Sequence, residues 1–474
     1  MQYSVVNYKT VKEGEGALRF DAEHYKIAYL DIKKKLESKN FYYLHEILSK
    51  PIVTGHTPSM AVDSYYGGSI SFVKTDNVRE HVIADNFNHY LTEEGNRKIK
   101  RSQLKANDVL LTIIGASFDV VGRAVFVTDE ILPANINQNI ALIRVDNKKF
   151  NPKVLAVYLN SFYGRNYLYY LSRQTEQVNL NNKEVERLII PDFSKSVVNL
   201  ISRMVERSYQ LKQDSKSLYS QAEQLLLSEL GLLDWKPKHE LAFIKNFSDA
   251  KQSNRFDAEY FQPKYEEIVE AVKKYKGGFD ELGSLVKIKD KNFTPKDNEH
   301  YKYIELANIS SNGEINGYTE NFGNELPSRA RRKVQKGDLI VSSIEGSLES
   351  IALITEDWKN ALCSTVFFAI HSDKLNSETL LVLLKMKVGQ LQLKKGCKGT
   401  ILTAIGKDEL SKIVLPKMDL KIQEQIKEKI IEMYKTKKLS KSLLEIAKRG
   451  VEMAIEKDEE KAEKWIDTEI EKIF

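Results

Sequence analysis

The chain has 474 residues, of which 42% are hydrophobic and 29% are charged, so it is long enough for two to four globular domains. Its longest apolar runs are too short to cross a membrane, and the N-terminal sequence has no signal-peptide pattern. A formal net charge of +6 permits an anionic partner such as nucleic acid but does not require one.

The first half of the chain predicts a short helix, many short strands and two longer helices, in that order. The short helix follows the pentapeptide RFDAE at Arg19–Glu23, where Asp21 is expected to cap it. A segment rich in Val, Ile, Tyr, Gly and Asn then indicates strands. A helix is predicted at about 152–171, and a last strand ends at Pro191. A long helix begins after this proline and ends near Gly231.

The second half repeats this order. RFDAE recurs at Arg255–Glu259, and residues 150–191 align without a gap on residues 375–416 at a constant shift of 225. The helix predicted at about 377–395 and the strand that follows it are therefore counterparts of elements in the first half. A pentapeptide can recur by chance, but a register shared over this length cannot. The chain is interpreted as a tandem duplication.

The two long helices carry the heptad spacing of a coiled coil. Apolar or small residues alternate at steps of four and three from Val197 to Leu225, and a more polar series runs from Ile422 to Val451. Two helices packed separately on their own domains would also satisfy this pattern. The matching register favours antiparallel packing of the helices on each other. At 1.5 Å per residue, a helix of ~35 residues is roughly 50 Å long.

The predicted fold class is α+β, with two tandem-repeat β-rich domains, each followed by a long helix, and with the two helices forming an antiparallel coiled coil. The predicted segments, in chain order, are a first β-rich domain at 1–193, a long helix at 194–231, a linker at 232–238, a second β-rich domain at 239–417, a long helix at 418–456 and a charged helical tail at 457–474. The tail has apolar residues, such as Trp465 and Ile466, that could dock a partner. A solvated tail is an equally good interpretation.

The motifs of familiar enzymes and metal sites are missing. No Pro-Pro dipeptide occurs, so the Asn/Asp-Pro-Pro-aromatic motif of amino-methyltransferases is absent, and no glycine-rich dinucleotide or phosphate loop is present. The eight histidines have no ligand spacing, and the distant cysteines Cys363 and Cys397 form no metal-type pair. Asp192 or Ser194 is expected to cap the first long helix. We therefore expect a reduced, cytoplasmic protein without catalytic residues, metal or cofactor of its own.

Three segments of the first half resemble a known family, the specificity subunits of type I restriction-modification enzymes. They are TGHTPSMAVDSYYGGSISFVKTDNV at 54–78, which resembles a Gly-x-Thr-Pro-Ser segment of that family, NDVLLTIIGASFDVVGRAVFV at 107–127 and NINQNIALIRV at 135–145. The order of these segments, the duplication and the closing prolines make the resemblance specific over nearly the whole chain. The second half departs from the pattern, with KDKNFTPKDN in place of the first segment, as expected if the two domains read different DNA sequences.

The resemblance implies a non-catalytic DNA-specificity subunit with two target-recognition domains, at 1–193 and 239–417, each of which reads one half of a split site in double-stranded DNA. It implies that the coiled coil sets the spacer and docks two methyltransferase subunits, which would bind S-adenosylmethionine and flip adenines. Restriction or translocase subunits would bind this chain indirectly, as members of the same complex, and the role of that complex would be antiviral defence. Alternatives are a non-catalytic two-lobed protein scaffold, or the specificity subunit of a related split-site system whose partner is a fused nuclease-methyltransferase.

Base reading requires donors and acceptors that reach the groove edges, whereas Lys and Arg contact phosphates. The candidate base-reading residues of the first domain lie in loops near predicted strand ends: His56, Thr57, Lys74, Thr75, Asp76, Asn77, Arg79, Ser117, Asn137 and Gln138. Their counterparts in the second domain are Lys302, Glu305, Asn308, Ser343, Ser347 and Ser364. The candidate phosphate contacts are Arg97, Lys98, Lys100, Arg101, Arg329, Arg331, Arg332, Lys333, Lys395 and Lys398. Each polar residue could instead be a turn former, and each basic run a solvated surface.

Overall fold

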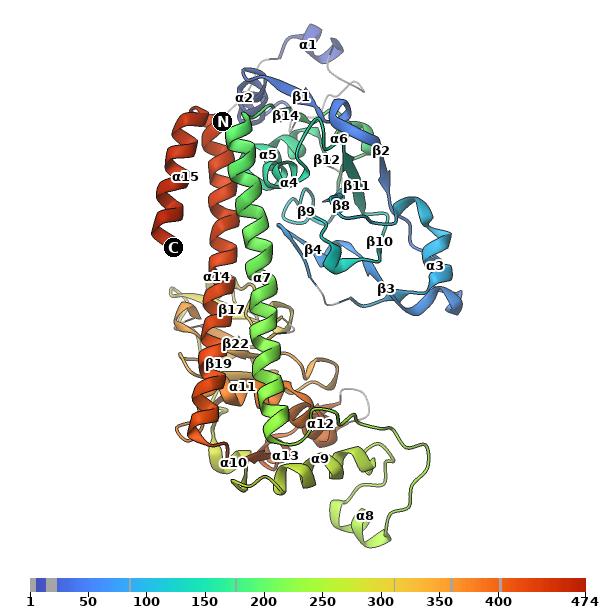
Figure 1. Cartoon of the computed structure of the whole chain (residues 1–474), viewed down its shortest axis with the longest axis vertical. Helices are drawn as coiled ribbons and strands as arrows, with labels where there is room; N and C mark the ends of the chain where they lie inside the picture. Colours follow the sequence, from blue (N-terminus) through green and yellow to red (C-terminus); the bar gives the residue numbers. More distant parts are fainter. Residues whose placement is uncertain are drawn as a thin grey trace. The chain divides into compact units, whose positions relative to one another are not determined.

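The structure is a computed structural model that describes residues 6–13, 24–84, 87–174, 177–310, 312–358, 361–399 and 403–474. It contains two compact units, of which unit 1 comprises Met1–Lys212 and Lys438–Phe474, and unit 2 comprises Gln213–Lys437. The first copy of RFDAE lies outside the described residues. Figure 1 shows the elements of both units along the chain.

Unit 1 has a four-stranded antiparallel sheet as its centre, with the strand order β2-β11-β7-β9. These strands are β2 (Leu48–Thr54), β11 (Ile140–Val145), β7 (Val109–Thr112) and β9 (Ala124–Phe126). Alternate residues point to opposite faces of a strand, so Val109 and Leu111 enter one hydrophobic core while Leu110 enters another. Both faces of the sheet are therefore covered, which explains why β7 is a continuous apolar run.

A second sheet of unit 1 has the order β10-β3-β6, in which β10 runs parallel to β3. Its strands are β10 (Ala134–Ile136), β3 (Tyr66–Val73) and β6 (Tyr90–Leu91). The shorter strands of unit 1 are β1 (Phe41–Tyr43), β4 (Val78–Arg79), β5 (Val82–Ile83), β8 (Ile114–Gly115), β12 (Arg173–Gln174), β13 (Val178–Asn179) and β14 (Ile189–Pro191). Strand β1 pairs with β14, so the predicted last strand closes the unit.

Unit 2 repeats this topology. Its central sheet has the order β16-β23-β20-β21, its second sheet has a parallel pair β17-β22 flanked by β18 and β19, and β15 pairs with β26. The strands are β15 (Phe279–Glu281), β16 (Lys287–Lys289), β17 (His300–Ile304), β18 (Thr319–Phe322), β19 (Ala330–Lys333), β20 (Leu339–Ser342), β21 (Ile351–Leu353), β22 (Leu362–Ser364), β23 (Phe367–His371), β24 (Cys397–Lys398), β25 (Ala404–Ile405) and β26 (Val414–Pro416). The sequence repeat is thus also a repeat of strand order.

The helix predicted at about 152–171 is two helices, α4 (Pro152–Asn160) and α5 (Phe162–Leu171), and the one predicted at about 377–395 is likewise α11 (Ser377–Lys385) and α12 (Lys387–Gly396). The prediction of one continuous helix was wrong because Ser161 is extended, with ψ 164°, and its hydroxyl caps α5 by accepting from Gly164 N. A Cβ at Gly164 would lie 2.0 Å from the Tyr158 carbonyl oxygen, so the close approach of the two helices needs glycine.

The long helices α7 (Lys195–Glu229) and α14 (Leu420–Glu456) pack antiparallel, as predicted (Figure 1). In unit 1, Ser208 Oγ donates to Ser440 O at 2.9 Å, and Ser440 Oγ donates to Ser208 O at 2.8 Å. In unit 2, Ser215 Oγ donates to Met433 O at 3.2 Å. The residue numbers of the contacting residues increase along α7 while they decrease along α14, which is the register of an antiparallel pair. The small serine side chains let the two backbones approach closely. Antiparallel packing and the α+β fold class are confirmed.

The remaining helices are short, apart from one at the C-terminal side. They are α1 (Tyr8–Glu13), α2 (Ile27–Glu37), α3 (Glu93–Lys98), α6 (Asn182–Glu186), α8 (Phe247–Ser253), α9 (Pro263–Lys273), α10 (Leu282–Leu285), α13 (Lys407–Ser411) and α15 (Glu459–Ile473). In α15, Ala462 and Ile466 are fully buried in the core of unit 1. The interpretation of the tail as solvated was therefore wrong. No helix in the described part of the chain is long and apolar enough to span a membrane.

Candidate functional site

In unit 1, several predicted site residues meet at one edge of the sheets. Val73 pairs with Ile136, so the parallel strands β3 and β10 end side by side, and the loops that follow them lie together. Thr57 Oγ1 donates to Gln138 Oε1 at 2.6 Å, which joins the loop after β2 to this edge. We call this surface the polar edge, and it comprises His56, Thr57, Lys74, Thr75, Asp76, Arg79, Asn137 and Gln138. The loop that carries Ser117 is adjacent, because Ile113 N donates to Asn139 O at 2.9 Å.

Three of the predicted residues form turns, and one of them is Asn137, which is buried and whose Oδ1 accepts from Asn139 N at 3.3 Å. Asn77 is buried, and its Oδ1 accepts from Lys74 N at 2.9 Å. In unit 2, Asn308 Oδ1 accepts from Glu305 N at 2.8 Å in the equivalent turn. These contacts fit the turn-forming alternative for all three asparagines. On the polar edge, by contrast, the side chains of His56, Asp76, Arg79 and Gln138 are exposed.

The polar edge is anchored to the long helices of unit 1 by the turn between β4 and β5. Tyr209 OH, on α7, donates to His81 O at 3.1 Å, and Glu80 lies 3.6 Å from Lys448 Nζ on α14. His81 itself is buried with a left-handed φ of 59°. Arg79 is the last residue of β4, directly before this turn, so the packing of the turn on the helices also fixes its backbone position.

The basic run of unit 1 lies apart from the polar edge. Lys100 and Arg101 line a groove of about 470 Å³ together with Lys50, Lys105 and Arg144. Arg144 pairs with Lys50 at one end of β11 and β2, whereas Ala141 pairs with Thr54 near the polar edge. Of these five cations, Arg144 bonds to the buried Asp108, with Nε 2.9 Å from Oδ1. The other four have no ion pair with a described residue, so the groove favours an anion. Arg97 and Lys98 are exposed in the last turn of α3.

The sequence interpretation missed two arginines beside the polar edge, Arg123 and Arg165. Arg165 Nη2 donates to Phe118 O at 2.6 Å, and the guanidinium carbon lies 4.8 Å from the centre of the Phe118 ring. Burial lowers the pKa of both arginines, and nearby charges, including those of Glu80 and Asp119, modify the shift. In the sequence, Arg123 is marked by its place after Gly122 at the end of an irregular segment. Nothing in the sequence indicated that α5, which carries Arg165, packs against that segment.

In unit 2, the predicted serines are held by the sheet. Ser343 Oγ donates to Val366 O at 2.8 Å, Ser347 Oγ lies 2.9 Å from Ser342 Oγ, and Ser364 is buried. Lys302 is different, since its Nζ lies 4.9 Å from the Tyr318 ring centre in a cation–π contact. The three serines are thus hydrogen-bonded or buried within unit 2, whereas Lys302 is held by an aromatic ring.

The predicted basic residues of unit 2 fall into two groups. Arg331, Arg332 and Lys333 belong to β19, which pairs with β22, and Arg329 O, just before the strand, accepts from Thr365 N at 2.9 Å. Lys398 instead forms an ion pair with Glu409 at 3.0 Å, and Lys395 packs over the Tyr260 ring. The β19 group is thus joined to the sheet, while the charge of Lys398 is balanced on another element.

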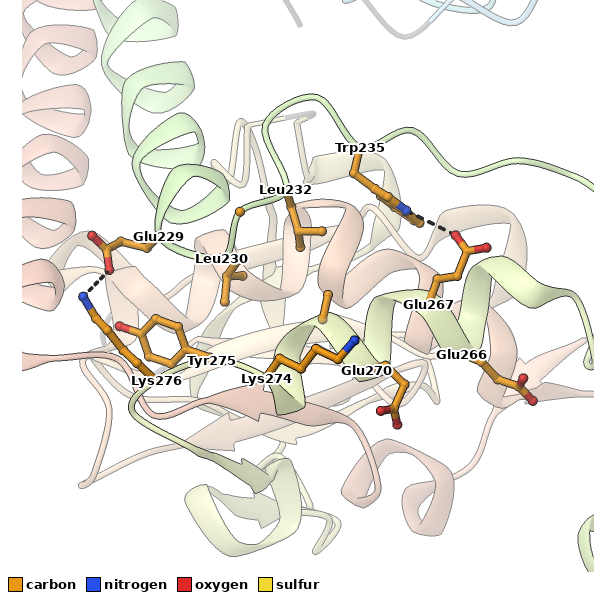
Figure 2. A pocket seen from close by; sticks show the side chains of 12 residues that line it. Glu229, Leu230, Leu232, Trp235, Glu266, Glu267, Glu270, Lys274, Tyr275 and Lys276 are labelled. Atoms are coloured by element: carbon orange, nitrogen blue, oxygen red, sulfur yellow. Dashed lines mark hydrogen bonds and ion pairs between the residues drawn. The ribbon is translucent and has the colours of Figure 1, made fainter.

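A larger cavity of about 810 Å³ in unit 2 contains none of the predicted site residues. Figure 2 shows that it is lined by several glutamates, with Trp235 Nε1 bonded to Glu267 at 3.2 Å and Lys276 beside Glu229 at 3.6 Å. The other glutamates of the lining are Glu266 and Glu270. Because these carboxylates repel phosphate, we do not assign this cavity to nucleic acid.

A curated protein and several solved structures are similar to this chain. No family model matches the chain. The type I restriction enzyme EcoBI specificity subunit of Escherichia coli is 26% identical over 140 residues, which cover 30% of this chain and 28% of that protein. The chain thus matches less than a third of the length of this relative. The resemblance noted in the sequence is confirmed by this match.

Solved structures of the same family were also found. The S subunit of a type I restriction-modification system from M. genitalium is 13% identical to this chain, with a TM-score of 0.37. The matched region covers 92% of this chain and 96% of the S subunit. The HsdS subunit from Thermoanaerobacter tengcongensis has 14% identity, covers 88% and 97%, and gives a TM-score of 0.29. With TM-scores below 0.5, the fold assignment depends on the strand order and helix packing described above.

Proposed function

From this similarity we propose that the chain is the DNA sequence-recognition subunit of a type I restriction-modification complex, with each unit reading one half of a bipartite site. The observation that supports the proposal most is the duplication, in which the same strand order occurs twice and is attached each time to a long antiparallel helix. Two related but diverged readers suit a site made of two different halves.

In this proposal, the polar edge of unit 1 enters the major groove and reads base edges. Its exposed residues have the required chemistry, since Gln bonds adenine through two contacts, Asp accepts from cytosine, and Arg bonds guanine. The groove with Lys50, Lys100, Arg101 and Lys105 contacts phosphates and fixes orientation. In unit 2, Lys302, Glu305 and the arginines of β19 are the corresponding candidates.

The helices α7 and α14, with 35 and 37 residues, set the spacer between the half-sites. At 1.5 Å per residue each is about 50 Å long, enough to support two readers separated by one turn of DNA, ~35 Å. Two methyltransferase subunits dock on these helices, bind S-adenosylmethionine and flip the target adenines, and restriction subunits join through them. The chain itself contributes recognition and no catalytic group.

Methylation mapping tests this function directly. The chain is expressed with the methyltransferase subunit encoded beside it, and modified adenines are mapped across the host genome. A split motif with a fixed spacer is expected. An assembled complex that is active with another specificity subunit but methylates no such motif with this one would contradict the proposal and favour a protein scaffold.

Salt dependence tests the phosphate groove and separates DNA binding from a scaffold role. DNA affinity is expected to fall linearly on a log–log plot against salt, and replacement of Lys100 and Arg101 by Glu should lower the slope by about 0.9 for each lost contact. The matched control replaces Lys461 and Lys464, two exposed lysines of α15, by Glu. A slope that is equal in the two double variants would remove the groove from the interface.

A further inference from the structure

The loop at 116–123 of unit 1, between β8 and β9, is held in place by Arg165. The Arg165 guanidinium donates from Nη2 to Phe118 O at 2.6 Å and stacks on the Phe118 ring. Gly122 lies against the same side chain, because a Cβ there would be 3.3 Å from Arg165 Nη1. The position of Arg123, the last residue of this loop, therefore depends on Arg165.

Unit 2 holds its equivalent loop without an arginine. Gln390 occupies the position of Arg165 under the shift of 225 residues, and its Nε2 donates to Leu348 O at 3.2 Å. Leu348 follows β20 at the same distance as Phe118 follows β7. A neutral amide is therefore sufficient to hold this loop, and the positive charge of Arg165 is not needed for that purpose.

Arg123 also has an uncharged counterpart. Thr112 N donates to Arg123 O at 3.0 Å, and Ser342 N donates to Ser350 O at 3.1 Å in the equivalent place of unit 2. The backbone contact is the same in both units, while the side chain is a guanidinium in one and a hydroxymethyl group in the other. Unit 1 thus has two cations that its fold does not require.

The two guanidiniums have unused donors. Arg165 Nη1 is buried without a hydrogen-bond partner, and Arg123, which is partly buried, has no hydrogen bond or ion pair through its side chain to any described residue. Guanidinium donors that bond to no group of the protein lose hydrogen bonds to water on burial, which costs free energy. Such donors point to an acceptor that a ligand supplies.

The neighbouring charges decide which acceptor fits. His81 N donates to Ala124 O at 3.0 Å, so the β4–β5 turn lies beside Arg123, and the charges of Arg79, Glu80, Asp119 and Asp76 all act on it. Three of these four neighbours are carboxylates, which repel phosphate. A base edge is neutral, and guanine offers two acceptors, O6 and N7, that match the guanidinium fork.

We propose that Arg123 reads a guanine in the half-site of unit 1 and that Arg165 is a positioning residue that fixes the loop carrying Arg123. The inference depends on the proposed function and deepens it by assigning a base to a residue. Because Ser350 and Gln390 stand at these positions in unit 2, the other half-site lacks this contact.

The test uses residues that the second unit already tolerates. Arg123→Ser and Arg165→Gln are made in the full chain, assembled with the methyltransferase, and methylation is measured on oligonucleotides in which each base pair of the motif is varied. Arg123→Ser should reduce discrimination at one guanine of one half-site by about 10- to 100-fold and leave the other half-site unchanged. Arg165→Gln should reduce discrimination at the same guanine to a smaller extent, with an unchanged urea midpoint.

Arg123→Lys distinguishes guanine from phosphate, because lysine keeps the charge but cannot form the two parallel bonds. Loss of discrimination at the guanine with preserved affinity for unrelated DNA supports the inference. An equal loss of affinity for all sequences, or an unaltered motif in Arg123→Ser, overturns it. Arg187→Gln, outside the polar edge, is the control. If the unmodified chain directs no split motif at all, the proposed function fails instead, so the two failures are distinguishable.

Discussion

His81 is a buried neutral histidine that helps to set the polar edge of unit 1. Its Nδ1 lies 3.3 Å from Asn160 Nδ2, and the same amide nitrogen donates to Ala124 O at 2.7 Å. An amide nitrogen offers no acceptor, so a proton on Nδ1 would face a donor, and the neutral ring with Nδ1 unprotonated fits this place. Burial, aided by the charge of Lys448, lowers the pKa of His81 to about 3.

This histidine should make the stability of unit 1 depend on pH. In the unfolded chain His81 takes up a proton below pH ~6.5, whereas in the folded chain it stays neutral down to about pH 3. The unfolded state therefore binds more protons in this window, and the free energy of unfolding should fall as the pH falls, by at most about 1.4 kcal/mol per pH unit. The His81→Asn substitution should reduce this pH dependence, and asparagine tolerates the left-handed φ of this position.

Urea unfolding at pH 7.5 and pH 5.5 measures the effect. From pH 7.5 to pH 5.5, the free energy of unfolding of the unmodified chain should fall by about 1 kcal/mol more than that of the His81→Asn variant. His56→Asn is the matched control, since His56 is exposed and should leave the dependence unchanged. A pH dependence that is equal in all three proteins would show that His81 is accessible to protons in the folded state.

Helix α15 illustrates how an amphipathic segment finds its partner within the chain. Its apolar side packs on α14, where Gly450 makes room for it, because a Cβ there would lie 2.4 Å from Ile466 Cδ1. Ile466→Ala should lower the free energy of unfolding by about 2–4 kcal/mol, through lost burial and the cavity left behind.

Asp467→Ala is the control for this element, because Asp467 is the exposed neighbour of Ile466 and its replacement should change stability by less than about 0.5 kcal/mol. Both variants are compared by urea unfolding, with attention to the transition of unit 1. Equal stability of the two variants would mean that α15 is undocked in solution.

The duplication gives the whole molecule two readers that should be exchangeable one at a time. Replacement of 53–191 by the corresponding segment of another specificity subunit should change one half of the methylated motif and preserve the other half and the spacer, because α7 and α14 are retained. Methylation mapping measures the result. A reciprocal exchange of 286–416 is the control and should alter the opposite half. A change of both halves in either chimera would contradict independent reading.

The sequence by itself determined the duplication, the order of the elements and the antiparallel helix pair. These features depend on periodicity and register, which burial imposes on the chain locally, so the seam from Val197 to Leu225 predicted the partner face without a structure. It also indicated Ser194 as the cap of α7, and Ser194 Oγ does accept from Val197 N at 3.3 Å.

Only the tertiary structure decided which polar residues are available to a ligand. Asn77 and Asn308 look like base readers in the sequence but close turns, whereas Arg165 lies on a helix and is brought to the polar edge by its contact with Phe118, 47 residues away in the chain. The same holds for the break at Ser161 and the docking of α15. Such outcomes depend on contacts between segments that are distant in the chain, and the free energy of those contacts cannot be inferred from a local sequence pattern.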